Sequence, residues 1–317
     1  MSYVTSAVST QELAARALDV SMFVGNNVLE RYQALPQWRS GGSWAAGSDL
    51  TDGNGPTRWA FDRQANLPTF PTSVAAFTTV SLIFDLTPGT ADRDAFDSVF
   101  IFGHNFYQLG YCRITLEIAD TNDFSGGSFF TVATWDDPAT ALRLASLSNI
   151  RWSSLRYMRL RIRCYTAADH LTPAAITTVP YLCELWCGRA RQQPHFPQSN
   201  GYDEQATKSE VVDFVADDGA IIRYVKAEGQ RFIDATYNPA TETSIGIDAV
   251  ATFRGWWKDC NYGSKPSVFV ESPTTALATS SMIMYPDPSM NMTLNGPYDR
   301  NFRIRLDETS PYLSSET

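Results

Sequence analysis

Short runs of alternating apolar and polar residues dominate the chain from residue 79 onward. A period of two places every second side chain on the same face of a strand, so these runs predict β-strands. They are rich in β-branched and aromatic residues, and turn-forming stretches such as TPGTADRD separate them. In the first part of the chain the candidates are 79–86, 97–103, 112–119, 129–135, 156–165 and 181–188. Strands at this spacing predict an all-β sandwich or jelly roll.

Helical patterns are rare by comparison. Only ELAARAL (12–18) and, less clearly, DPATALRLASL (137–147) have the composition of a helix. The later stretches VVDFVA, AIIRYVKAEG, QRFIDATYN, IGIDAVATFRGWW, PSVFVES, SMIMYP and DRNFRIRLDE extend the β-rich pattern. A polar, proline-containing segment precedes them and predicts a boundary. We therefore expect a β-sandwich in 1–192, a linker in 193–209 and a second, smaller β-rich domain in 210–317.

The stretch Asp97–Phe106, DSVFIFGHNF, raises the question of whether its histidine is catalytic. Four consecutive apolar residues, from Val99 to Phe102, indicate a strand that is buried on both faces. Gly103 ends this strand, and a turn follows before the next one. We therefore interpret His104 as a turn residue that hydrogen-bonds to the backbone.

Charge narrows the range of partners. The 317-residue chain has a formal net charge of −9 and a pI of about 4.9, which makes nucleic acid a poor partner. The densest basic run, RYMRLRIR, alternates with apolar residues, as expected for a half-exposed strand with arginines along one face. Its arginines are candidates for contacts with acidic neighbours in other subunits: Arg156, Arg159, Arg161 and Arg163.

The cysteines suggest a reducing environment. The five cysteines are scattered, and none forms a C-x-x-C pair. Together with an N-terminus that lacks the features of a signal peptide, this favours folding in the cytoplasm and buried, unpaired thiols. No apolar stretch of about 18 residues occurs, so we expect no membrane insertion.

No enzyme motif occurs in the sequence. The three histidines lie in different predicted turns, and there is no G-x-S-x-G elbow, phosphate-binding glycine loop or metal-ligand spacing. Acidic residues are plentiful, but no pair stands out as the two carboxylates of a glycosidase. We therefore expect no catalytic residue, no cofactor and no metal, although an esterase or glycosidase acting on a surface polymer remains a weaker alternative.

Residues 31–71 have a different composition from the rest. Three tryptophans, Trp38, Trp44 and Trp59, lie among glycines, serines and asparagines. Indole faces stack on sugars, and a long polar loop on the rim of a sandwich can bind a ligand. The alternative is a loop whose aromatic side chains cap the open end of the sandwich. Both interpretations stay open.

Residues 75–190 resemble the galactose-binding-like, or discoidin-type, jelly roll. The resemblance rests on the order VSLIFDL, DSVFIFGHNF, CRITLEIADTNDF, FFTVATW, SSLRYMRLRIRCY and YLCELWCGRA. It implies a jelly-roll β-sandwich in the first part of the chain. The residues that bind sugar in that family lie in variable loops, so none can be transferred to this sequence.

A narrower resemblance concerns function. DSVFIFGHNF, followed later by ELWCGRARQQPHFP, looks like structural proteins of tailed bacteriophages, and the segment FRGWWKDCNYGSKPSVFVESP is similar in style to tail-tip proteins. The resemblance implies a virion component of the tail tip or baseplate, assembled in the host cytoplasm. Its expected partners are copies of itself in a ring and other virion proteins. The alternatives are a module that binds host-surface glycan and a capsid decoration or head-associated protein.

Overall fold

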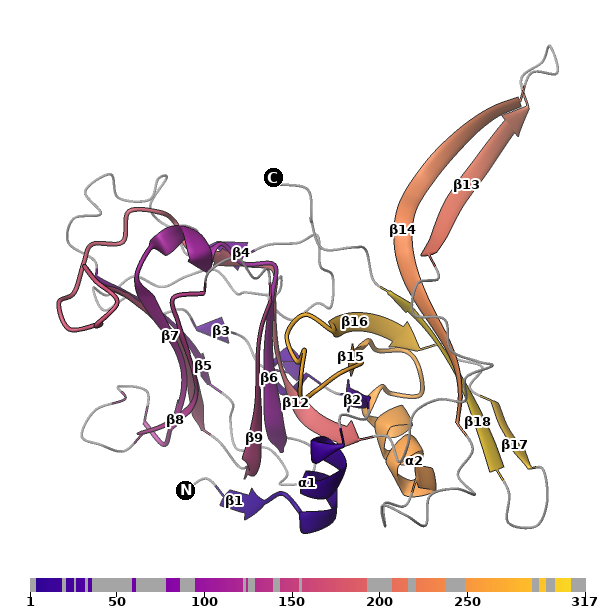
Figure 1. Cartoon of the computed structure of the whole chain (residues 1–317), viewed down its shortest axis with the longest axis horizontal. Helices are drawn as coiled ribbons and strands as arrows, with labels where there is room; N and C mark the ends of the chain where they lie inside the picture. Colours follow the sequence, from indigo (N-terminus) through magenta and orange to yellow (C-terminus); the bar gives the residue numbers. More distant parts are fainter. Residues whose placement is uncertain are drawn as a thin grey trace.

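The computed structural model shows an all-β sandwich with two antiparallel sheets (Figure 1), as the sequence pattern predicts. It describes residues 4–18, 21–25, 27–31, 34–35, 59–60, 78–85, 95–121, 124, 129–138, 143–153, 156–192, 207–215, 221–237, 249–286, 291–294 and 300–308. All structural statements below concern these residues.

The first sheet has five strands. Its order is β3 (Ala34–Leu35), β5 (Thr79–Asp85), β10 (Tyr157–Cys164), β7 (Cys112–Ala119) and β8 (Phe129–Asp136). Along β10 the burial alternates residue by residue, so Met158, Leu160 and Ile162 face the core while the arginines between them face outward. This is the period-two pattern that the sequence predicted for this strand.

The second sheet is larger and faces the first across the core. In the described part of the chain it has 11 strands. Their order is β1 (Val4–Ala7), β9 (Arg143–Ser153), β6 (Phe96–Phe102), β12 (Glu184–Gln192), β2 (Met22–Gly25), β15 (Ser267–Val270), β16 (Ser281–Pro286), β18 (Arg300–Glu308), β14 (Ile221–Tyr237) and β13 (Thr207–Val215), and β17 (Asn291–Leu294) also pairs with β18. A separate short pair joins β4 (Trp59–Ala60) to β11 (Tyr181–Leu182).

The main core lies between the two sheets. Every residue of β6 is buried, which confirms the prediction of a strand covered on both faces. Its inner side packs with the core-facing residues of β5, β7 and β10 in one hydrophobic cluster. Its other side, through Phe100 and Phe102, joins a cluster with β2, β12 and β15. Burial of each such side chain contributes about 1.5–3 kcal/mol.

One of the two predicted helices is present. The helix α1 (Thr10–Ala17) confirms the prediction for 12–18. The prediction for 137–147 is wrong, because residues 143–147 of that stretch belong to strand β9. There the pairing of Leu144 with Ile101 and of Ala145 with Phe100 outweighs the local helical preference.

The helix α2 (Ala249–Asp259) corrects a further prediction, since IGIDAVATFRGWW was expected to form a strand. The stretch carries Phe253 and Trp256 three residues apart and Cys260 four residues later, and all three are fully buried. This spacing fits one face of a helix rather than a strand. Their cluster also contains Phe23 of β2, whose ring stacks on Trp256 with centroids 4.4 Å apart.

The predicted division into 1–192, 193–209 and 210–317 stays a prediction. Strand β2 pairs with β12 on one side and with β15 on the other, so strands from both sides of the expected boundary share one sheet. Strand β13 begins at Thr207, inside the segment expected to be a linker.

Strands β13 and β14 form a long arm that projects from the rest of the molecule (Figure 1). Residues Phe232–Tyr237 of β14 pair with β18 and anchor the arm in the large sheet. Beyond them, from Arg231 to Ile221, the described residues of β14 pair with β13 alone. The outer part of the arm is therefore a two-stranded ribbon.

Candidate functional site

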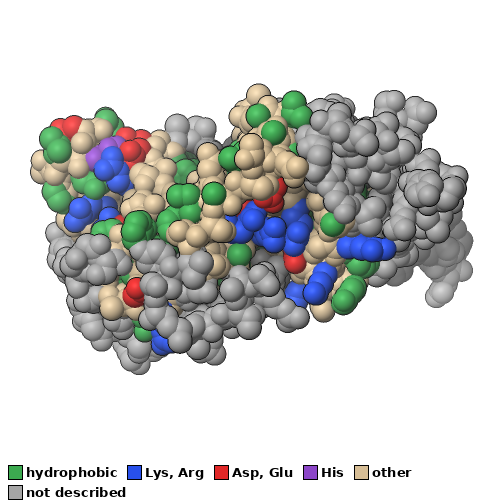
Figure 2. Space-filling view, turned by 90° about the horizontal axis from the view of Figure 1, so that it is seen from below, with side chains coloured by type: hydrophobic (Ala, Val, Ile, Leu, Met, Phe, Trp, Pro, Cys, Tyr) green, Lys and Arg blue, Asp and Glu red, His purple; other side chains and the backbone are tan. Residues whose placement is uncertain are grey.

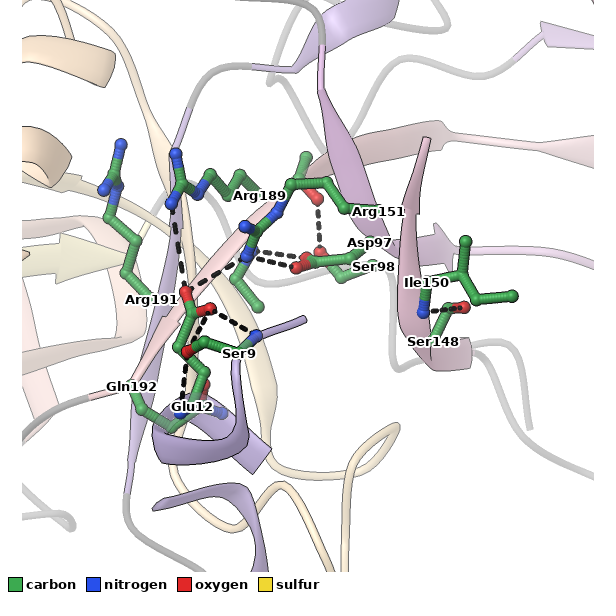
Figure 3. Close-up of polar contacts among 12 residues, drawn as sticks. Ser9, Glu12, Asp97, Ser98, Ser148, Ile150, Arg151, Arg189, Arg191 and Gln192 are labelled. Atoms are coloured by element: carbon green, nitrogen blue, oxygen red, sulfur yellow. Dashed lines mark hydrogen bonds and ion pairs between the residues drawn. The ribbon is translucent and has the colours of Figure 1, made fainter. Parts of the chain in front are cut away.

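A network of charged side chains joins α1 to the large sheet, and Asp97 lies at its centre (Figure 3). The Asp97 side chain is fully buried. Its Oδ2 accepts from Nη2 of Arg16 at 2.9 Å and from Nη2 of Arg151 at 3.0 Å. Its Oδ1 accepts from the backbone N–H of Ala190 at 2.8 Å. A buried carboxylate needs this degree of compensation, because desolvation of an unpaired charge costs several kcal/mol.

The start of α1 is fixed by its own sequence. Ser9 and Glu12 form a capping box in which each side chain bonds to the other residue's backbone N–H, both at 3.2 Å. The remaining oxygen of Glu12, Oε1, accepts from Arg151 at 3.1 Å. At the other end of the helix, Arg16 Nη1 donates to the carbonyl of Ser148 at 2.7 Å. The helix is thus tied to β9 at both ends.

The pKa of Glu12 is lowered by this arrangement. Burial by itself would raise the pKa of Glu12, but the charge of Arg151 and the hydrogen bonds from Ser9 outweigh the burial. Glu12 therefore stays ionised to a lower pH than in an unfolded chain, and the stability that it contributes is lost as the pH falls below the ordinary range of a glutamate.

A second ion pair fixes α2 to β12. Arg191 Nε donates to Oδ2 of Asp259 at 2.8 Å. Two glycines allow this close approach. A Cβ at Gly25 would lie 2.7 Å from the Cβ of Asp259, and a Cβ at Gly255 would lie 2.6 Å from the guanidinium of Arg191. The helix, β2 and β12 therefore meet at a contact that larger residues would push apart.

Arg189 lies between these two ion pairs and has no comparable partner. Its nearest carboxylate oxygen, Oε1 of Glu12, is 3.9 Å away and already accepts from Arg151. Its buried Nε has no hydrogen-bond partner. The pKa of Arg189 is lowered, first by burial and then by the charges of Arg151 and Arg191. A guanidinium in such surroundings favours an additional anion.

We call Arg16, Arg151, Arg189 and Arg191 the arginine cluster. Figure 3 shows the guanidinium groups of Arg151 and Arg189 directed toward Glu12, with Arg191 beside them. In Figure 2 lysine and arginine side chains gather in the middle of the face seen from below. Arg189 is the most accessible member of the arginine cluster, since its side chain is 35% exposed. The arrangement is suited to binding a carboxylate or another small anion.

Of the arginines expected at an interface, Arg159, Arg161 and Arg163 lie on the outer face of the five-stranded sheet, and Arg156 directly precedes β10. Arg159 and Arg161 both pair with Glu117 of β7, and Arg161 Nη2 lies 2.7 Å from Oε1. Glu117 is fully buried although it lies on the outer face of the sheet. Arg163 donates to the hydroxyl of Thr79 at 3.2 Å, and the Arg156 guanidinium lies 5.1 Å from the ring centre of Tyr157. Their role in contacts between subunits stays a prediction.

Aromatic rings cover part of this surface. The guanidinium of Arg159 lies 4.1 Å from the ring centre of Phe124 and 5.7 Å from that of Phe129. Cation–π contacts at these distances add stability beyond the ion pair with Glu117. Arg159 is therefore held on the protein's own surface by an acid and by aromatic rings.

The tryptophans proposed to contact glycan lie outside the residues whose side chains the structure describes. Trp38 and Trp44 fall in undescribed segments, and only the backbone of Trp59 is described, in β4. The glycan interpretation stays a prediction.

His104 is a turn residue bonded to the backbone, as predicted. Its Nδ1 accepts from the N–H of Phe106 at 3.2 Å, and the two rings stack with centroids 4.7 Å apart. Burial lowers the pKa of His104 to about 4. The left-handed backbone conformation in this turn belongs to Gly103, with φ of 60°. The five cysteines are all buried thiols outside disulfides, as the sequence predicts.

One polar cluster lies at the rim, where β8 ends. Nε2 of His170 lies 3.0 Å from Oδ1 of Asp137, and the same oxygen accepts from the backbone N–H of Cys112 at 2.8 Å. Asp137 and His170 both have left-handed backbone conformations, with φ of 44° and 53°. These bonds tie the loop that contains His170 to the end of the sheet, and the described part of the cluster includes no nucleophile aligned with the histidine.

The sequence interpretation did not single out Asp97, Glu12, Arg16, Arg189 or Arg191. Two signals were available. S-T-Q-E at residues 9–12 has the spacing of a capping box, and Asp97 is an acid next to a run of four apolar residues, Val99–Phe102. The partners of Asp97 are 81 and 54 residues away in the chain, so no local pattern could identify them.

Among the described residues, no group of three or more histidines, cysteines or acids is arranged to hold a metal ion. In the same part of the chain, no helix has the length and apolar character needed to cross a membrane.

Comparison with known proteins adds little. No protein-family model matches the chain, and no curated protein matches significantly. A solved structure titled "Crystal structure of SpGH29" matches with a TM-score of 0.31 and 14% identity. The match covers 52% of this chain and 28% of that one. A similarity of this size carries no argument about fold or function.

Proposed function

We propose that this chain is a structural component of a bacteriophage virion, in the tail tip or baseplate, and that it acts through interfaces between copies in a symmetric ring. The resemblance of DSVFIFGHNF and the later strands to tailed-phage structural proteins suggests this role. The observation that carries it is the β13–β14 arm, because such a ribbon is suited to contacting a neighbour.

The arm is poorly supported by its own chain. A two-stranded hairpin is marginally stable in water, and strands gain stability from a third strand or from packing on a hydrophobic face. From Ile221 to Arg231 the described part of β14 pairs only with β13. A neighbouring molecule would supply the missing support.

The register of the arm adds to this argument. Val212 pairs with Tyr224, and Phe214 pairs with Ile222. These two pairs are two residues apart, so all four residues belong to the same face of the ribbon, and all four are apolar or aromatic. A ribbon with such a face is expected to dock on another apolar surface.

Mass photometry and electron microscopy of the purified full chain test the proposal. We expect oligomers that close into rings as the concentration rises. A variant in which a two-residue Asn-Gly turn replaces residues 213–223 shortens the arm and should form fewer oligomers. A chain that stays monomeric at every concentration, or rings that form equally well with the shortened arm, would contradict the proposal.

A further inference from the structure

We propose that Arg189 is a docking point for a carboxylate of a second copy of this chain, and that the acidic pair Asp217 and Asp218 of that copy's arm supplies it. The inference deepens the proposed function and rests on it. It goes further by naming the residues that meet.

The first argument is the local charge. Four guanidiniums, those of the arginine cluster, share three carboxylates: Asp97, Glu12 and Asp259. Asp97 is shared by Arg16 and Arg151, and Asp259 is paired with Arg191. One positive charge therefore has no counter-charge of its own in the described network.

The second argument is the geometry, which assigns that excess charge to Arg189. Its 3.9 Å separation from Glu12 exceeds hydrogen-bonding distance, and its Nε is buried without a partner. The side chain is nevertheless 35% exposed, so an incoming group can reach it. The guanidinium of Arg189 is partly buried beside two other positive charges, those of Arg151 and Arg191. An added carboxylate would offset the resulting desolvation and repulsion. The lowered pKa of Arg189 agrees with this picture.

The third argument concerns the occupant. A guanidinium binds a carboxylate through two parallel hydrogen bonds. The overall charge of −9 repels long polyanions, whereas it gives every copy many carboxylates to offer. The five residues that connect β13 to β14, ADDGA, contain two adjacent acids. Val215 and Ile221, which flank this connection in the sequence, form the last described pair at the outer end of the arm.

A charge exchange tests the inference. We expect Arg189→Glu to weaken association of the full chain roughly tenfold or more, as does loss of a buried interfacial charge pair. Asp217→Lys with Asp218→Lys should weaken it similarly. The combination of all three substitutions should restore association, because the pair is then reversed. Association is measured by sedimentation velocity over a concentration series.

Two controls separate the charge effect from misfolding. Arg189→Met removes the charge without adding an acid, and circular dichroism should show an unchanged fold with weakened association. Arg254→Glu makes the same change of charge at an exposed residue of α2 and should leave association unchanged. Two outcomes would overturn this inference alone. One is an Arg189→Glu variant that associates as strongly as the wild type, and the other is a triple variant in which association is not restored. A wild-type chain that never associates would overturn the proposed function as well.

Discussion

Asp97 and Glu117 are both fully buried carboxylates, and each is held by two arginines. The arginines of Asp97 come from α1 and β9, which are distant in the sequence. Those of Glu117 come from one neighbouring strand, in which Arg159 lies directly opposite Glu117. The same chemical group therefore joins separate elements in one region and stabilises a single sheet in the other.

The difference shows how the setting of an ion pair decides its consequence. Arg16 is 7% exposed and cannot turn to water if its partner is lost. Arg151 and Arg159 are about equally exposed, at 12% and 13%, but Arg161 is 27% exposed, so rotation of Arg161 toward solvent offers a partial alternative to its pair with Glu117. Loss of Asp97 should therefore be the more damaging change, and it should release α1 from the sheet.

Asp97→Asn should destabilise the protein most, by about 3–5 kcal/mol, because it leaves the buried guanidinium of Arg16 without an anionic partner and leaves Arg151 with Glu12 alone. Urea unfolding at pH 7.5 measures the change in the free energy of unfolding. Hydrogen exchange should show the amides of α1 opening first. A loss below about 1 kcal/mol would contradict this prediction, since it would mean that buried Arg16 tolerates the loss of its anionic partner.

His104 provides a contrast to the two buried carboxylates, because it is a buried titratable group without a charged partner among the described residues. Its Nε2 has no hydrogen-bond partner there. Its pKa of about 4 lies below the ordinary value of 6.5, so the folded protein resists protonation while the unfolded chain accepts the proton. At pH 7.5 both states are neutral. As the pH falls from 6.5 toward 4, stability should decline by about 3 kcal/mol on this account.

The measurement is the free energy of unfolding from pH 7.5 to 4 for the wild type and for His104→Asn. The asparagine oxygen can replace Nδ1 as acceptor for the N–H of Phe106, but asparagine does not titrate. We expect a flatter pH dependence in the variant, and carboxylates such as Glu12 contribute equally to both curves. Identical curves would show that the histidine is not held neutral by burial.

Glu117→Gln should cost less than Asp97→Asn, about 1–3 kcal/mol, because water can reach Arg161, which is 27% exposed. Arg159 also keeps its contacts with Phe124 and Phe129. Urea unfolding of the two variants side by side gives the ratio directly. Equal losses would show that partial exposure of the arginines provides no relief, and the distinction between the two regions would fail.

Most of the fold could be predicted from the sequence because strand periodicity is a local signal. It identified β5, β6, β7, β8, β10 and β12 within a few residues. It failed where tertiary contacts decide the structure: residues 143–147, expected to be helical, belong to β9 because they pair with β6. The candidate site is harder to predict from the sequence than the fold, since its arginines and acids come from α1, β6, β9, β12 and α2. Only the fold brings these segments together.

The smallest effect is expected at the start of α1. Ser9→Ala removes the hydroxyl that accepts from the N–H of Glu12, which should cost about 1 kcal/mol. Because the same substitution frees Glu12 from one partner, its pKa should move toward the ordinary value, which proton-detected NMR titration can follow. Ser148→Ala, which leaves the backbone carbonyl bonded to Arg16 in place, is the matched control. If Ser9→Ala changed neither stability nor the Glu12 titration, the capping box would not position α1, and the link from Asp97 through Arg16 would hold the helix unaided.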